Sequence, residues 1–193
     1  MKEKRILYFQ KPGKHNTGRL IRLVRERLPS LSVSHLLVAS SSGDTALKLA
    51  GEIPRSPVPL ICVAEHCGFV GGDVQLLTDR NRARLRELKI PILIGTHALS
   101  GIERSFSKKF GGVSPVEIMA YTLRLLGCEG IKVAVEISVM AADAGLVPTD
   151  REILAVTGTG QGADTAVVLK PAHMNNIFDL EIREILAKPR QRD

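Results

Sequence analysis

Three serines and a glycine separate an apolar run from a helical segment in the stretch VASSSGDTALKLAG. The candidate anion-binding residues of this stretch are Ser40, Ser41, Ser42, Gly43 and Thr45. The first N–H groups of a helix have no partner within the helix, so a helix start that adds hydroxyl donors can hold an anion. The stretch therefore predicts a phosphate cradle, and an ordinary helix N-cap is the simpler alternative.

A second glycine-rich segment, GTGQGAD, contains Gly158, Thr159, Gly160, Gly162 and Asp164. Its beginning matches the G-x-G-x-x-A pattern of dinucleotide-binding turns, but that pattern requires a helix directly afterwards. The strand-like run TAVVL follows instead, so we expect no nicotinamide site. The glycines still allow backbone N–H groups to approach an anion closely.

Two histidines, His97 and His173, each follow the end of a predicted strand, where functional side chains collect in open α/β sheets. Either could instead be a loop histidine bonded to the backbone. Glu136 and Asp143 stand among apolar residues, and a buried carboxylate needs a hydrogen-bond partner. We favour a structural role for both carboxylates, and the sequence assigns no catalytic residue.

The three cysteines are an odd number in a chain of this size, which favours reduced thiols over a disulfide framework. Cys62, His66 and Cys67 are close in sequence, but Cys62 lies within an apolar strand. No second ligand pair has the spacing of a structural zinc site. We therefore interpret all three as core or strand-end residues and predict no metal site.

Strands and helices alternate along the chain, which predicts a parallel, doubly wound sheet. Apolar runs of strand length occupy residues 35–40, 59–66, 91–97, 152–158 and 164–172. Helical spacing predicts helices at residues 16–28, around 46–50, at 79–88 and at 114–127. The last of these has Ser114 as N-cap, Pro115 in the first turn and Glu117 to close a capping box.

Three segments are harder to assign. Residues 131–145 alternate like a strand in their first half but also present a helical face, and periodicity alone favours the strand. Residues 96–114 show no clear period and form a long loop of the kind that is functional or mobile. The tail at 179–193 alternates imperfectly and is a candidate last edge strand.

The bulk composition is that of one globular domain spanning residues 1–193, because 44% of the 193 residues are hydrophobic. No apolar run approaches the roughly 20 residues of a membrane span and no signal-type stretch opens the chain, so we expect a cytoplasmic protein without a membrane partner. The net charge of +7 suits anionic partners. Only 4% of the residues are aromatic, so nucleic acid is the partner class that we favour least.

The stretch VASSSGDTALKLA resembles the first strand, phosphate loop and helix of the C-terminal domain of pyruvate kinase, whose loop binds a sugar phosphate. Ser40, Ser42, Gly43, Thr45 and Ala46 fill that pattern. The stretches GTHALSGIERS, MAADAG, GTGQGADTAVV and PAHMNN are similar to a small stand-alone family of pyruvate kinase C-terminal-like proteins, known mainly from archaea. This resemblance spans nearly the whole chain.

The resemblance implies a three-layer α/β/α sandwich with a mostly parallel sheet of about five strands, in the order 3-2-1-4-5 with the last strand antiparallel. It also makes residues 131–145 a helix. Ligands favour the crevice at the point where such a strand order reverses, between strands one and four. We therefore expect the serine loop and the glycine loop to face each other across one cleft, enclosed by the loop that begins at Thr96 and His97.

The family resemblance further implies flavin mononucleotide (FMN) as cofactor, with its phosphate on the serine loop and His97 near its ring. We expect no pyruvate kinase activity, because the catalytic barrel of that enzyme has no counterpart in this sequence. Asp44 stands where the kinase loop often has a basic or neutral residue, which argues against a sugar bisphosphate. The alternative is a non-catalytic metabolite-sensing or assembly module that binds another phosphorylated ligand and forms a homo-oligomer or a ligand-dependent complex.

Overall fold

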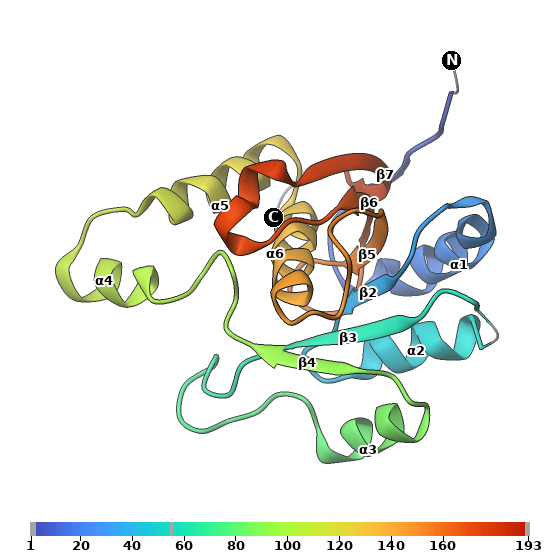
Figure 1. Ribbon diagram of the computed structural model, residues 1–193, viewed down its shortest axis with the longest axis horizontal. Helices are drawn as coiled ribbons and strands as arrows, with labels where there is room; N and C mark the ends of the chain where they lie inside the picture. The colour runs from blue at the N-terminus through green and yellow to red at the C-terminus, as the bar shows by residue number, and fades with distance from the viewer. Residues whose placement is uncertain (1–2, 55, 192–193) are drawn as a thin grey trace.

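A seven-stranded mixed sheet forms the centre of the computed structural model, which describes residues 3–54 and 56–191 (Figure 1). The strand order is β1-β7-β6-β5-β2-β3-β4. The strands are β1 (Leu7–Phe9), β2 (Leu36–Ala39), β3 (Leu60–Glu65), β4 (Ile92–Gly95), β5 (Ile153–Thr157), β6 (Thr165–Lys170) and β7 (Glu181–Pro189). Strands β4, β3, β2 and β5 run parallel, whereas β6 is antiparallel to both β5 and β7.

Helices cover both faces of the sheet, as expected for a three-layer sandwich. The helices are α1 (Thr17–Arg27), α2 (Asp44–Glu52), α3 (Asp79–Glu87), α4 (Glu103–Phe110), α5 (Pro115–Leu126) and α6 (Glu129–Asp143). The first three pack on one face, where Leu20, Leu49 and Leu85 share a core cluster with sheet residues. Helix α6 packs on the other face, and α5 lies outside it (Figure 1).

The order of the five expected strands is confirmed, including the antiparallel fifth strand, but the expected strand count was too low. The C-terminal tail forms β7, and β1 pairs with its outer side, so β7 is not the edge strand. Strand β1 is only 3 residues long and carries no detectable period of its own. Register shifts in the β6–β7 ladder explain why the alternation of the tail is imperfect.

Periodicity alone favours a strand for the first half of residues 131–145, and this prediction is wrong. Residues 131–143 belong to α6, as the family resemblance implies, and Ala144 and Gly145 follow its end. Helix α6 is enclosed between the sheet and α5, and residues on several sides of it are buried. A helix covered on more than one side has apolar residues at most positions, so its periodicity is lost.

The segment at 96–114 is not all loop, because it contains the short helix α4. The predicted capping box at the start of α5 is confirmed: Glu117 N–H donates to Ser114 Oγ at 3.2 Å, and Ser114 N–H donates to Glu117 Oε2 at 2.8 Å. Among the helices that the structure describes, none has the length and hydropathy to cross a bilayer.

Candidate functional site

The carboxyl ends of β2, β3 and β5 border a cavity of about 810 Å³, which we call the cleft. Parallel strands end at the same edge of a sheet, so the loops that follow them meet there. The serine loop (residues 40–43) follows β2, and the glycine loop (residues 158–163) follows β5, the neighbour of β2 in the sheet. Both loops line the cleft, so segments more than a hundred residues apart in sequence face the same cavity.

The serine loop leads directly into α2 through a turn that requires glycine. Gly43 is the N-cap of α2 and has a φ of 90°, a region that favours glycine. A Cβ at this position would lie 2.8 Å from Leu77 Cδ1 and 2.9 Å from Asn81 Cβ, so Gly43 faces α3. Ser40 Oγ accepts a hydrogen bond from Ala46 N–H at 3.4 Å, which caps the first turn of α2 from inside the loop.

Helix α3 holds the far side of the serine loop. Asn81 Nδ2 donates to the Ser42 carbonyl oxygen at 2.9 Å and to Asp44 Oδ1 at 2.8 Å, and Ser42 Oγ donates to Asp44 Oδ2 at 3.0 Å. The hydrogen bond from Asn81, followed by that from Ser42, lowers the pKa of Asp44 below its ordinary value. The Ser41 side chain makes no hydrogen bond to a described residue, and it lines the cleft.

The glycine loop is fixed by the N-terminal segment of the chain. Buried Asp164 accepts hydrogen bonds at Oδ2 from Gly13 N–H at 2.8 Å and from Thr159 N–H at 3.2 Å. Ala163 N–H donates to Thr17 Oγ1 at 2.9 Å, which ties the loop to the start of α1. A Cβ at Gly162 would lie 2.4 Å from Thr17 Oγ1, so only glycine permits this close approach.

Cationic side chains line the cleft, and the Asp44 carboxylate lines it as well. Lys14, Lys48 and Arg104 line it, and none of the three forms an ion pair with a described residue. Lys48 and Lys14 both lower the pKa of Asp44, so they act electrostatically at the start of α2. The N-terminus of α2 adds its own positive partial charge. The serine-loop end of the cleft, where Lys14 and Lys48 act on Asp44, therefore has more cationic than anionic side chains and is suited to an anion.

A buried ion pair forms another part of the cleft wall. Lys132 Nζ lies 2.6 Å from Glu136 Oε2, and their side chains are only 5% and 2% exposed. Leu99 N–H donates to Glu136 Oε1 at 3.0 Å, so the same carboxylate anchors the loop after β4. The structural role expected for Glu136 is therefore present, and the carboxylate also lines the cleft.

A group of aromatic rings follows the carboxyl ends of β3 and β4, and two of them, Phe69 and His97, line the cleft. The His97 and Phe69 rings lie 4.9 Å apart, and His66 lies 6.1 Å from His97. Burial lowers the pKa of His97 below its ordinary value, although the nearby Glu136 carboxylate opposes this shift. Glu65 also lines the cleft, and its buried Oε2 has no hydrogen-bond partner among the described residues.

The cleft brings most of the predicted site residues together. Those that line it are Ser40, Ser41, Ser42, Thr45, His97, Gly158, Thr159, Gly160 and Gly162. Gly43, Thr96 and Asp164 do not line it: Gly43 faces α3, Asp164 is buried beneath the glycine loop, and Thr96 is exposed outside the lining. Asp164 and Gly43 shape the two loops from behind.

Other lining residues were missed by sequence analysis. Lys48 follows the serine loop by one helical turn and could have been found from that spacing. Lys14 and Thr17 could not, because they reach the cleft only through the packing of the N-terminal segment. Phe69 lies in an irregular loop, residues 66–78, which has no periodic pattern.

The remaining candidate residues lie outside the cleft. His173 Nδ1 is 3.0 Å from Asp143 Oδ1 at the end of α6, and both side chains are partly exposed, so the expected burial of Asp143 was wrong. Burial raises the pKa of the Cys62 thiol to about 12, as expected for a core cysteine. In the part of the chain that the structure describes, no three His, Cys, Asp or Glu side chains are arranged to hold a metal ion.

Comparison with known proteins identifies the family of this domain. An NH3-dependent NAD synthetase from Campylobacter jejuni, solved in complex with the nitrate ion, matches 75% of this chain with 12% identity and a TM-score of 0.38. The match covers 56% of the synthetase chain. The family described as the pyruvate kinase alpha/beta domain matches residues 19–169, which include both loops of the cleft. The chain therefore belongs to the pyruvate kinase alpha/beta domain family.

Proposed function

We propose that this protein binds FMN in the cleft, with the phosphate at the serine loop and the ring system toward Phe69 and His97. The observation that carries the proposal is that the serine loop and the glycine loop line one cavity. Its volume of about 810 Å³ lies within the usual range of small-molecule sites. A flavin bound there would supply hydride or single-electron transfer.

The donors at the start of α2 support the phosphate position. The Ser41 hydroxyl has no hydrogen-bond partner among the described residues, Thr45 lies in the first turn of α2, and both line the cleft. Lys14 and Lys48 would supply the positive charge that balances a phosphate dianion. Each charge-assisted hydrogen bond is worth about 1.5–3 kcal/mol.

The aromatic end supports the ring position. Phe69 offers an apolar face beside His97, and burial favours the neutral form of that histidine. The unpartnered Glu65 Oε2 would accept a hydrogen bond from a ring N–H, which would satisfy a buried acceptor that is otherwise costly to leave unpaired. The proposed phosphate end of the cleft is therefore cationic, and the proposed ring end offers an apolar face and a hydrogen-bond acceptor.

Parallel titrations with FMN and riboflavin test the proposal, because the two flavins differ only in the phosphate. We expect binding to quench the fluorescence of FMN and to raise the melting temperature of the protein. FMN should bind about a hundredfold more tightly than riboflavin, since two charge-assisted hydrogen bonds are worth about 3 kcal/mol or more. A protein that binds neither flavin, or both with equal affinity, would contradict the proposal.

Replacing Glu65, the carboxylate that we place beside the ring, tests the ring position separately from the phosphate position. Glu65→Leu should weaken the binding of FMN and riboflavin alike by about tenfold to a hundredfold, because both lose one hydrogen bond to a charged acceptor. Glu87→Leu is the matched control, since Glu87 is exposed on α3 outside the cleft. Fluorescence titration of both flavins measures the effect. Loss of FMN binding with unchanged riboflavin binding would show that Glu65 does not contact the ring.

A further inference from the structure

Helix α4 has an apolar side that none of the described residues covers. Ile102, Phe106 and Phe110 are spaced by four residues, so they share one side of the helix, and they are 76%, 58% and 76% exposed. None of the residues of α4 is buried. A helix of 8 residues is unstable in water without tertiary packing, so α4 needs a surface against its apolar side.

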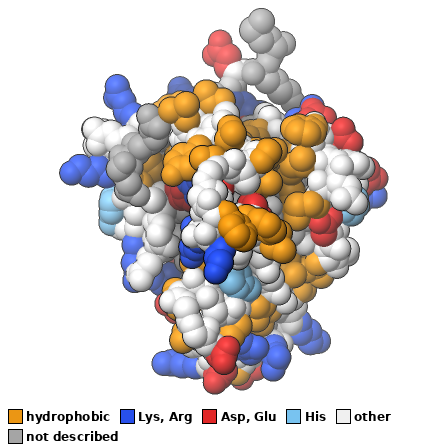
Figure 2. Space-filling model, turned by 90° about the vertical axis from the view of Figure 1, so that its left-hand side faces the viewer, with side chains coloured by type: hydrophobic (Ala, Val, Ile, Leu, Met, Phe, Trp, Pro, Cys, Tyr) orange, Lys and Arg blue, Asp and Glu red, His pale blue; other side chains and the backbone are white. Residues whose placement is uncertain are grey.

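The exposed apolar surface continues from α4 onto α5. Val113, Ile118, Tyr121, Leu125 and Leu126 extend it, and each of these side chains is between 57% and 80% exposed. Both helices lie at the left-hand side of Figure 1, away from α1 and α2. Figure 2 faces that side and shows hydrophobic side chains gathered there. We call residues 102–126 on this side the α4–α5 face.

The α4–α5 face is large enough for a stable interface. Its three aromatic and five aliphatic side chains expose on the order of 800 Å² together, taking about 150–250 Å² for a whole aromatic side chain and less for an aliphatic one. The largest apolar patch of a typical monomer is about 300–600 Å². A standard interface buries about 800 Å² on each partner, which is the size of this face.

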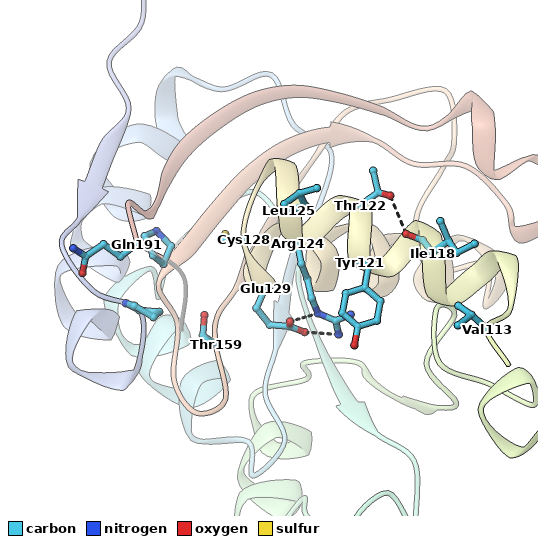
Figure 3. Close-up of a pocket in the computed structure, with 12 residues that line it drawn as sticks. Val113, Ile118, Tyr121, Thr122, Arg124, Leu125, Cys128, Glu129, Thr159 and Gln191 are labelled. Carbon is cyan, nitrogen blue, oxygen red and sulfur yellow. Dashed lines mark hydrogen bonds and ion pairs between the residues drawn. The ribbon is translucent and has the colours of Figure 1, made fainter. Parts of the chain in front are cut away.

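A pocket on this face leads toward the cleft. It has a volume of about 480 Å³, and Val113, Ile118, Tyr121 and Leu125 form its apolar wall. Figure 3 shows Arg124 turned toward Glu129, and the two residues form an ion pair. Arg124, Glu129 and Thr159 line both this pocket and the cleft. Whatever covers the α4–α5 face therefore also covers an approach to the cleft.

The charges around this face favour an apolar partner over a charged one. On α5, Glu117 accepts hydrogen bonds from Ser107 Oγ at 2.6 Å and Ser114 N–H at 2.8 Å, and Arg124 is paired with Glu129. On α4, Arg104 and Lys108 follow two residues after Ile102 and Phe106. That spacing turns them about 200° around the helix, away from the apolar side, whereas Glu103 and Lys109 flank that side with opposite charges.

We propose that a second copy of this chain covers the α4–α5 face, which makes the protein a two-fold symmetric dimer. A two-fold interface uses the same patch on both subunits, so one apolar face per chain is sufficient. In the dimer, α4 packs against the partner subunit and gains the tertiary contacts that it lacks in the single chain. Arg104, which α4 carries to the cleft, is held in place by the same packing.

Analytical ultracentrifugation of the protein without flavin tests the proposal independently of FMN binding. The unmodified protein should sediment at twice the chain mass of 21.0 kDa at micromolar concentrations. The double variant Phe106→Lys/Tyr121→Lys should be monomeric, with at least a hundredfold higher dissociation constant, because it places cations at the centre of the interface. Leu88→Lys is the matched control, since Leu88 is half-exposed at the end of α3, and it should remain dimeric.

Circular dichroism of the double variant separates loss of the dimer from loss of the fold. We expect an unchanged helical spectrum apart from the contribution of α4. An unmodified protein that sediments as a monomer over the whole concentration range would overturn the proposal and leave the face to a different protein. A double variant that still dimerises would place the interface elsewhere and would overturn it as well.

Discussion

The variant Lys132→Met should lose about 3–5 kcal/mol of unfolding free energy, which is the usual effect of removing one partner of a buried ion pair. Lys132 and Glu136 are 5% and 2% exposed, so solvent replaces the lost ammonium group poorly. The variant leaves the Glu136 carboxylate buried with Leu99 N–H as its remaining donor. Urea denaturation at neutral pH measures the loss.

Two companion variants show whether the loss comes from the buried charge. Lys132→Met/Glu136→Gln should recover more than half of the lost stability, because a neutral amide oxygen still accepts from Leu99 N–H. Lys170→Met removes the partly exposed partner of Glu181 and should change stability by less than about 1 kcal/mol. If Lys132→Met lowered the unfolding free energy no more than Lys170→Met does, water would have to reach the Lys132–Glu136 pair.

The variant Ser41→Asp should abolish FMN binding while riboflavin binding is unchanged. Two like charges about 4 Å apart repel by about 4 kcal/mol at an effective dielectric constant of 20, which corresponds to about a thousandfold loss of affinity. The Ser41 side chain makes no hydrogen bond to a described residue, so the substitution removes no internal contact. Fluorescence titration with both flavins gives the two dissociation constants.

Ser32→Asp is the matched control for Ser41→Asp, because Ser32 is exposed in the loop before β2, outside the cleft. It adds the same charge to the chain and should leave FMN binding unchanged. Equal losses of FMN and riboflavin in Ser41→Asp would indicate a displaced serine loop. Undiminished FMN binding would exclude the phosphate from this loop.

The sequence predicted the central sheet well because each of its five expected strands is a short apolar run bounded by polar residues or glycine. The meeting of the serine loop with the glycine loop could also be predicted, since it follows from the order of the strands alone. The start of α5 was predictable in detail, because a capping box is a local device made by Ser114 and Glu117.

The parts that sequence analysis missed depend on packing between distant segments. Strand β1 is 3 residues long and is stabilised by pairing with β7 at the other end of the chain. That pairing places the N-terminal segment beside the glycine loop, where Gly13 N–H and Thr17 Oγ1 bond to it. No local pattern around Lys14 indicates that this residue reaches the cleft.

Helix α6 shows the limit of periodicity as a signal. Its residues face the sheet, α5 and the cleft on different sides, so polar residues do not mark a solvent-exposed face. Lys132 and Glu136 are four residues apart and form an ordinary helical ion pair in sequence terms. Their burial, and with it their expected contribution to the free energy of unfolding, can be recognised only from the structure, in which the sheet and α5 cover different sides of the helix.

A crystal structure of the protein with bound FMN tests the central claim most directly, because it locates the phosphorus atom. Our account predicts phosphate oxygens within hydrogen-bond distance of the Ser41 hydroxyl and of N–H groups at the start of α2. It also predicts the ring beside Phe69. A phosphate bound away from the serine loop, with the cleft between the two loops empty or filled by another part of the ligand, would contradict the account.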